Sequence, residues 1–124
     1  MLKKLISACG IGAIACLSIL PSKASTSTVC SRASYYGHGD VYHGRTTASG
    51  ERFNGYGISA AHRSFRFGTL VKVVNPITKR SIVVKINDRG PFVAGRDLDL
   101  SYGAFSMIAN PSSGVIPVCY TQLS

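Results

Sequence analysis

The sequence predicts an all-β domain, a closed or partly closed barrel of about six short strands with one or two short helices. A chain of 124 residues has room for one domain at most. Its 13 glycines and only 15% charged residues exclude a coiled coil or a long-helix bundle. Short β-branched runs separated by turn residues fill the second half of the chain, which is the pattern of an all-β protein.

The first residues, 1–24, have the pattern of a secretory signal peptide. Two lysines precede an uncharged run of 16 residues from Leu5 to Leu20, and small residues occupy Ser22 and Ala24. A run of this length falls short of the ~20 residues that a membrane-spanning helix needs. We therefore expect cleavage after Ala24 and export to the periplasm or cell envelope, rather than a permanent membrane anchor.

A second processing route is also visible in this segment. The residues from Ala13 to Cys16 loosely resemble a bacterial lipobox, and lipidation at Cys16 would attach the protein to a membrane by acyl chains. The apolar run continues to Leu20, which favours cleavage at Ala24. Lipid anchoring stays open as the alternative.

Two cysteines, Cys30 and Cys119, lie near the two ends of the expected mature chain. In an oxidising compartment such a pair is expected to form a disulfide that ties the termini together. A loop of this length gives a stabilisation of roughly 4 kcal/mol by chain-entropy reasoning. Two separate buried thiols are the alternative.

The mature chain begins with small polar residues, so we expect a short leader over 25–31 and a folded domain over 32–124. A first strand is predicted from Arg32 to Tyr36. The glycine-rich segment from Gly37 to Gly57 has no sustained apolar period and predicts a long loop. Loops of this length in a compact domain are usually functional.

Beyond Ile58 the pattern becomes regular. The β-branched runs Leu70–Asn75 and Ser81–Ile86 predict a hairpin, because turn residues separate them. The segment from Asn87 to Pro91 then breaks the second run with turn residues.

The last third of the domain contains two more predicted strands and a helix. Leu98 and Leu100 alternate with polar residues in a short strand, and Ser101 can cap a helix that runs to about Ile108. A final strand is predicted over Gly114–Tyr120.

The chain has only five acidic residues, so each can be weighed. Asp88 follows an apolar strand at a Gly-Pro turn, where partial burial can make a carboxyl group a general acid. An Asx-turn cap is an equal alternative for Asp88. Asp97 and Asp99 alternate with leucines and are expected on a solvated face or paired with Arg96.

The histidines give weaker evidence of a functional site than the acidic residues do. His62 is either a structural hydrogen-bonding group or a catalytic one, and the structural role is the more common for a single histidine. The spacing of His38, Asp40 and His43 matches no recognised zinc pattern, so no metal site is expected.

The chain carries a net charge of +9, and its basic residues are interleaved with aromatic ones. That combination can indicate nucleic-acid binding. Export argues against it, because the abundant polyanions outside the cytoplasm are cell-wall and lipid surfaces. We therefore expect an anionic glycan, and no nucleic acid, as the partner.

Four linked motifs in the order of the chain resemble the bacterial rare lipoprotein A family. They are Ala33-Ser34-Tyr35-Tyr36-Gly37, the stretch from His43 to Phe53, Ala60-Ala61-His62-Arg63, and Ile86-Asn87-Asp88-Arg89-Gly90-Pro91-Phe92. The resemblance extends over about residues 32–120, and four motifs in matching order are far more specific than any one of them.

The resemblance implies a six-stranded double-psi β-barrel, related to the barrels of expansins and of the lytic transglycosylase A type. It also implies an endolytic peptidoglycan lytic transglycosylase. We expect a monomer and no cofactor. Such an enzyme prefers glycan strands lacking stem peptides and leaves 1,6-anhydro-muramic ends. A non-catalytic expansin-like module that binds or loosens peptidoglycan is the alternative.

The same resemblance assigns site residues. Asp88 and His62 are the expected catalytic pair, and Glu51 is expected to line the same groove. The further expected substrate-binding residues are Tyr35, Tyr36, Thr47, Ser49, Asn87 and Arg89.

Overall fold

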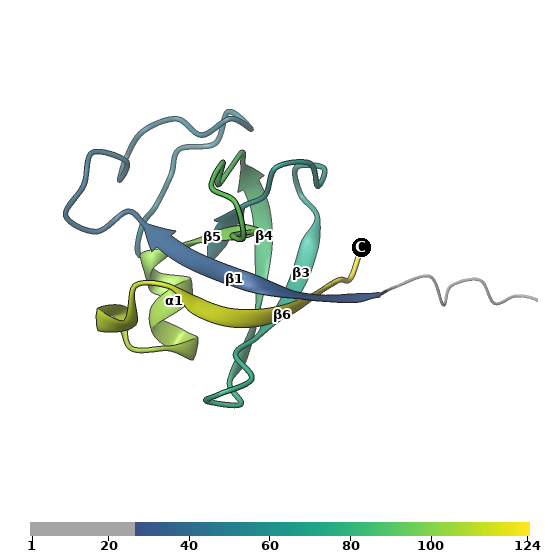
Figure 1. The fold of residues 1–124 in the computed structure, drawn as a ribbon. Helices are drawn as coiled ribbons and strands as arrows, with labels where there is room; N and C mark the ends of the chain where they lie inside the picture. Colours follow the sequence, from purple (N-terminus) through teal and green to yellow (C-terminus); the bar gives the residue numbers. More distant parts are fainter. Residues whose placement is uncertain (1–26) are drawn as a thin grey trace, which may run out of the picture.

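The computed structural model describes residues 27–124. The predicted signal peptide and the lipobox cysteine Cys16 lie outside the described residues. Six strands close into a barrel in the order β1-β5-β2-β4-β3-β6 (Figure 1). Within the described part of the chain, no helix has the length and apolar character needed to cross a membrane.

The elements follow the predicted order. They are β1 (Thr28–Tyr36), β2 (Ser59–Ala61), β3 (Leu70–Val74), β4 (Ser81–Asp88), β5 (Leu98–Ser101), α1 (Tyr102–Ile108), the short 3-10 helix η3 (Pro111–Ser113) and β6 (Ile116–Gln122). The prediction of an all-β barrel with one or two short helices is confirmed.

Several strand boundaries differ from the prediction: β4 continues to Asp88 instead of ending at Ile86, β6 lies two residues later than predicted, and the start of β1 differs most. β1 begins at Thr28 rather than at Arg32, so part of the predicted leader belongs to the barrel. The reason is pairing with the far end of the chain, since Thr28 and Val29 are in register with Thr121 and Tyr120 of β6. Small polar residues carry little local signal for a strand, and only the partner strand makes them one.

The pairing pattern explains how the chain closes on itself. β3 and β4 form the predicted antiparallel hairpin, with Val71 opposite Val84. β1 pairs with β5, and β2 with β4, in parallel. Parallel neighbours need crossover connections: the chain passes through β3 between β2 and β4, and through β2, β3 and β4 between β1 and β5. With these crossovers the closed six-stranded barrel has the expected double-psi form.

The core lies inside the barrel and under α1. Ile82, Val84 and Ile86 share the predicted inward face of β4 and are buried. Phe105 and Ile108 of α1 are fully buried in the same cluster. Ser101 caps α1 as predicted, because its hydroxyl accepts a hydrogen bond from the Ala104 N–H at 3.3 Å.

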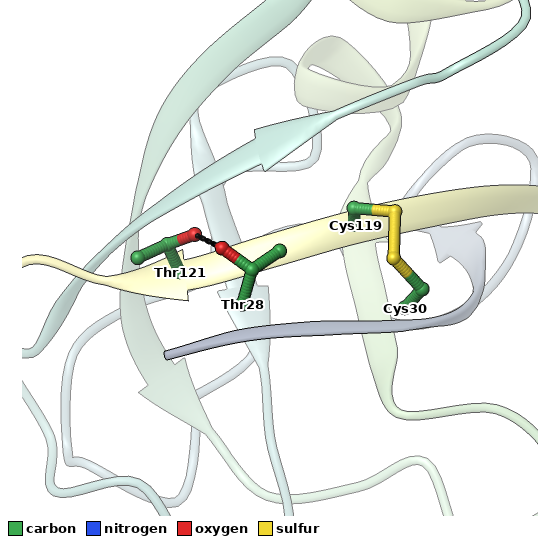
Figure 2. The surroundings of a disulfide bond; sticks show 4 residues. All are labelled: Thr28, Cys30, Cys119 and Thr121. Carbon is green, nitrogen blue, oxygen red and sulfur yellow. Dashed lines mark hydrogen bonds between the residues drawn. A yellow bond between two sulfur atoms is a disulfide. The ribbon is translucent and has the colours of Figure 1, made fainter. Parts of the chain in front are cut away.

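The predicted disulfide between Cys30 and Cys119 is confirmed. The two cysteines are direct partners in the β1–β6 register, and the bond joins the strands that carry the two ends of the domain (Figure 2). Beside it, the hydroxyl groups of Thr28 and Thr121 form a hydrogen bond of 2.8 Å.

The loop from 37 to 57 and the β4–β5 connection lie at the same end of the barrel, opposite the β3–β4 turn (Figure 1). The loop folds on itself at a close backbone contact. A Cβ atom on Gly55 would lie 2.1 Å from the carbonyl oxygen of Gly37. Only glycine fits there, so the two ends of the loop can lie against each other.

Candidate active site

Asp88 is the last residue of β4, and an irregularity in the strand decides where its side chain points. Ala60 pairs with Ile86, but the next residue, Ala61, pairs with Asp88, so Asn87 is an extra residue on β4. A bulge of this kind turns the following side chain to the other face. Asp88 therefore shares a face with Ala61 instead of entering the core beside Ile86.

Three donors hold the Asp88 carboxyl group. Its Oδ1 accepts hydrogen bonds from the N–H groups of Ala48 at 3.0 Å and Arg89 at 2.9 Å. Its Oδ2 accepts one from the Tyr36 hydroxyl at 2.9 Å. Since a carboxylate oxygen has two acceptor sites, Oδ2 keeps one free. Oδ2 can therefore take a further hydrogen bond from a molecule in the cavity.

Tyr36 is itself fixed by aromatic packing. Its ring stacks on Phe53 at 4.3 Å and meets Tyr42 edge-on at 5.7 Å. Burial, together with the charge of Asp88, raises the pKa of Tyr36 far above its ordinary value. The phenol therefore keeps its proton and acts as the donor to Asp88.

Asp88 lies in a cavity of about 450 Å³ at this end of the barrel. Aromatic and charged side chains line it, among them Tyr36, Tyr42, Arg45, Asp88, Arg96 and Asp99. Phe92 stands at its edge with 79% of its surface exposed. Concave sites with a few convergent polar groups are typical of ligand binding.

A second hollow of about 390 Å³ lies by the ends of β1 and β6. Val29, Tyr120 and Leu123 are among the residues that line it, and its described lining contains no Asp or Glu side chain. The chemistry of the domain therefore points to the cavity around Asp88.

Asp99 is a functional candidate that the sequence analysis missed. The expectation that it lies on a solvated face or pairs with Arg96 is wrong. Asp99 is half-buried in the cavity wall and accepts a hydrogen bond from the Ser34 hydroxyl at 2.7 Å. Burial raises the pKa of Asp99 above its ordinary value.

Asp97 also differs from its expectation. Its Oδ1 forms an ion pair with Arg63 at 2.9 Å, not with Arg96, and its Oδ2 accepts a hydrogen bond from the Tyr120 hydroxyl. The Tyr120 hydrogen bond, followed by Arg63, lowers the pKa of Asp97. Asp97 is thus an ionised structural group outside the cavity lining.

His62 is close to Asp88 through the backbone. Its N–H donates to the Asp88 carbonyl at 3.2 Å. Its ring nitrogen Nδ1 accepts hydrogen bonds from the N–H groups of Ser64 and Phe65, so the proton of the neutral ring is on Nε2. Burial and then Arg63 lower the pKa of His62. No hydrogen bond between the His62 and Asp88 side chains occurs among residues 27–124.

Glu51 lies in a neighbouring hollow of about 250 Å³ rather than in the Asp88 cavity. Ser49, Phe67, Lys85 and Asn87 line the same hollow. Glu51 and Lys85 form an exposed ion pair at 2.7 Å, and the hydrogen bond from Lys85 lowers the pKa of Glu51.

Thr47 and Ser49 shape the loop beside the Glu51 hollow. Their hydroxyl groups are 2.8 Å apart, and the Ser49 N–H donates to the carbonyl of Asn87 at 3.2 Å. These contacts place the N–H of the intervening Ala48 against Asp88. The loop therefore lies between the Asp88 cavity and the Glu51 hollow, and it also supplies a donor to the Asp88 carboxyl group.

Two other predicted site residues differ in position: Arg89 lines the Asp88 cavity, and Tyr35 does not. Arg89 lies over the Phe67 ring at 3.9 Å from its centroid and donates to the carbonyl of Phe65 at 2.8 Å. Tyr35 packs against Phe105 and Tyr102 of α1, and the structure does not bring it into the Asp88 cavity.

The side chains of His38, Asp40 and His43 each have a partner within the loop. Asp40 accepts hydrogen bonds from the N–H groups of Gly37 and Tyr42. His43 accepts one from the Gly55 N–H at 3.1 Å, and His38 stacks on Tyr102. Within residues 27–124 no group of three or more His, Cys, Asp or Glu side chains is arranged to hold a metal ion.

Comparison with known proteins agrees with this geometry. Residues 28–120 match the family model described as lytic transglycolase. The chain is 57% identical over 86 residues to a protein of Nostoc sp. named "Probable endolytic peptidoglycan transglycosylase RlpA", covering 69% of this chain and 23% of the relative. It is 45% identical to the "Endolytic peptidoglycan transglycosylase RlpA" of Campylobacter jejuni, covering 69% of this chain and 30% of that protein. The chain thus spans only about a quarter to a third of the length of these relatives.

Solved structures show the same fold. The Streptomyces papain inhibitor superposes with a TM-score of 0.64 at 20% identity, covering 79% of this chain and 96% of that one. An expansin from Clavibacter michiganensis also gives a TM-score of 0.64, at 25% identity, covering 79% of this chain and 51% of that one. The family match spans most of the described barrel, including Asp88 and its donors. The chain belongs to the rare lipoprotein A (RlpA) family of lytic transglycolases.

Proposed function

We propose that this domain is an endolytic peptidoglycan lytic transglycosylase that leaves 1,6-anhydro-muramic ends. The observation that carries the proposal is the Asp88 carboxyl group, held by three donors in a cavity with one acceptor site of Oδ2 free. The names of the relatives support the reaction class.

One well-placed carboxyl group can serve both halves of this reaction. As an acid it protonates the glycosidic oxygen while the bond from that oxygen to C1 of the muramic residue breaks. As the conjugate base it then takes the proton from the C6 hydroxyl, whose oxygen bonds to C1 and closes the anhydro ring. Glycoside hydrolysis instead needs a second carboxyl group, either to activate a water molecule or to act as nucleophile.

The arginines of the cavity support the proposed preference for strands lacking stem peptides. Such strands carry a free lactyl carboxylate on each muramic residue. The side chains of Arg45 and Arg96 line the cavity, and neither forms an ion pair within the described residues. Guanidinium groups bind carboxylates well, so the cavity suits a negatively charged glycan.

We propose that His62 acts on the site through its backbone hydrogen bond to Asp88. By capping the turn after β2 and bonding to the Asp88 carbonyl, it holds the end of β4 where the carboxyl group meets its donors. We therefore propose His62 as a positioning residue for Asp88. Glu51 and the residues around its hollow are proposed to contact the glycan strand beyond the cleaved bond.

The proposed location is the periplasm or cell envelope, and the proposed state is a monomer that binds no nucleic acid. The disulfide supports export, because such bonds persist in oxidising compartments. The predicted signal peptide over 1–24 points the same way. Intact-mass measurement of the exported protein tests whether the mature chain begins near Ser25 or at an acylated Cys16.

An expansin-like binding module is the second candidate, and the likeness to a solved expansin favours it. Both functions need the barrel and the cavity, so product analysis has to separate them. Purified denuded glycan strands are incubated with the protein and analysed by mass spectrometry. A lytic transglycosylase yields 1,6-anhydro ends, and a hydrolase yields ends heavier by one water. Glycan binding without any new ends would leave the expansin-like function standing.

A further inference from the structure

Two carboxyl groups, not one, face the cavity, and strand register places them. Ala61 is in register with Asp88 of β4 on one side and with Asp99 of β5 on the other. Directly paired residues carry their side chains on the same face of a sheet. Asp88 and Asp99 are therefore two strand spacings apart, about 10 Å between α-carbons, with Ala61 on the strand between them.

The two carboxyl groups have different surroundings. Asp88 accepts three hydrogen bonds, two of them from backbone N–H groups. Asp99 accepts one, from the Ser34 hydroxyl to Oδ1, and within the described residues its Oδ2 has no hydrogen-bond partner. Since Ser34 donates to Oδ1, a proton on Asp99 belongs on Oδ2, the oxygen without a partner.

The charged groups around Asp99 come from several elements. Arg96 precedes β5 and favours the ionised form of Asp99, as does the Ser34 hydroxyl of β1. Asp88 of β4 and Asp40 of the long loop oppose ionisation, and burial opposes it most strongly. Pairs of acids whose surroundings push their proton affinities apart commonly divide the acid and base roles of a reaction.

Asp97 shows what a purely structural aspartate looks like in the same segment. Both of its oxygens are occupied, by Arg63 and by the Tyr120 hydroxyl, and it is absent from the cavity lining. Asp99 leaves one oxygen unoccupied at the cavity, which a structural role does not require.

We propose that Asp99 is a second catalytic residue of this site, the acid that protonates the leaving glycosidic oxygen. The inference rests on the transglycosylase function proposed above. It assigns the acid step to Asp99 and leaves the base step to Asp88. The proton on Asp99 Oδ2 passes to the glycosidic oxygen as the bond to C1 breaks, and the leaving sugar departs as an alcohol. Asp88 Oδ2 takes the proton of the C6 hydroxyl as its oxygen closes the ring on C1. One proton then returns from Asp88 to Asp99 through solvent, which restores the starting state.

The test compares two substrates whose leaving groups differ. Wild-type protein and the variants Asp99→Asn, Asp88→Asn and Asp97→Asn are assayed on denuded glycan strands and on a 4-nitrophenyl β-glycoside of a GlcNAc-MurNAc disaccharide. The nitrophenolate leaves without being protonated, so it needs no acid. We expect Asp99→Asn to lose ~10²–10⁴-fold on glycan, the usual contribution of a positioned acid, and to stay within about tenfold of wild type on the aryl substrate. Asp88→Asn should be poor on both substrates, and Asp97→Asn should match wild type on both.

A pH profile on the glycan itself provides a second measurement. For wild type, kcat/KM should fall on the alkaline side as Asp99 loses its proton. Ser34→Ala removes a donor that favours the ionised form, so this alkaline limb should move to higher pH. These profiles decide the matter even where the aryl glycoside is not turned over by wild type.

The outcomes separate the two proposals. Anhydro ends from wild type together with full glycan activity in Asp99→Asn would overturn the role of Asp99 and leave the proposed function intact. Equal losses of Asp99→Asn on both substrates, or an alkaline limb that Ser34→Ala does not move, would overturn it as well. Absence of anhydro ends from folded wild-type protein would overturn the proposed function itself.

Discussion

The polar residues of β1 have different surroundings in the two halves of the strand. Its first half pairs with β6, where a disulfide and a threonine–threonine hydrogen bond join the strands (Figure 2). Its second half presents Ser34 and Tyr36 to the carboxyl groups of Asp99 and Asp88. In the first region the polar groups satisfy one another, whereas in the second they leave acceptor sites facing a cavity.

This difference separates groups that stabilise the fold from groups that are available for chemistry. We expect the free energy of unfolding to depend on the paired first half of β1 and the end of β6, which together form the β1–β6 seam. We expect turnover to depend on the second half of β1, at the cavity. A substitution at the paired ends of β1 and β6 that lowered the turnover of the folded protein would show that the two regions are not separable.

The largest expected effect on stability is at the seam. Replacing both Cys30 and Cys119 by alanine removes a link between residues 89 apart in sequence. Chain-entropy reasoning gives a loss of about 4 kcal/mol in the free energy of unfolding, as an upper value. Urea unfolding with and without reductant measures this loss. Turnover at low temperature, where the variant is still folded, should stay near that of wild type.

His62→Ala should give the next largest loss, because it leaves the N–H groups of Ser64 and Phe65 without their acceptor. Both N–H groups are only partly buried, so water replaces part of the lost hydrogen bonding and the loss should be about 1–2 kcal/mol in total. The pKa of His62 is lowered by folding, so the unfolded chain binds more protons and the stabilisation falls as pH drops below its ordinary value. Unfolding at a series of pH values should show the gap between variant and wild type narrowing in acid. A constant gap would contradict the neutral ring.

Tyr36→Phe keeps the ring on Phe53 and removes only the donor to Asp88 Oδ2. Loss of one hydrogen bond should lower stability by about 1 kcal/mol. Because Asp88 loses its orientation toward the cavity, kcat should fall more than KM rises. Steady-state kinetics on glycan strands check this, and a change in KM alone would make Tyr36 a substrate contact instead.

The smallest effect is expected at the ion pair between Glu51 and Lys85. Both side chains are more than 40% exposed, and exposed pairs contribute at most about 1 kcal/mol. Lys85→Met should therefore leave the unfolding midpoint almost unchanged. If glycan binding nevertheless weakens in a pull-down assay, the hollow beside Glu51 contacts the strand.

Local patterns in the sequence predicted much of the fold. The β3–β4 hairpin, the Ser101 cap and the Cys30–Cys119 bond each depend on short-range signals or on one pair of residue types. Asp88 was identified because a turn follows its strand, although the bulge at Asn87 that aims its side chain has no local signature.

Asp99 could not be identified in that way. Its alternation with leucines is the same as that of Asp97, and only the pairing of β5 with both β2 and β1 brings it to the cavity. Register between distant strands is set by the whole barrel. The orientation of His62 was equally hidden, because its partners are backbone N–H groups of the turn that it caps.

The most direct test of the account is the turnover of Asp88→Asn measured beside its stability. Asparagine keeps the size of the side chain and can keep part of its hydrogen bonding, but it cannot exchange a proton as an acid does. We expect 1,6-anhydro ends to fall by at least ~10²–10⁴-fold while glycan binding is retained and the free energy of unfolding changes by about 1 kcal/mol or less. If Asp88 only caps a turn, the variant will be slightly less stable and will produce anhydro ends at the rate of wild type. That result would contradict the catalytic role of Asp88.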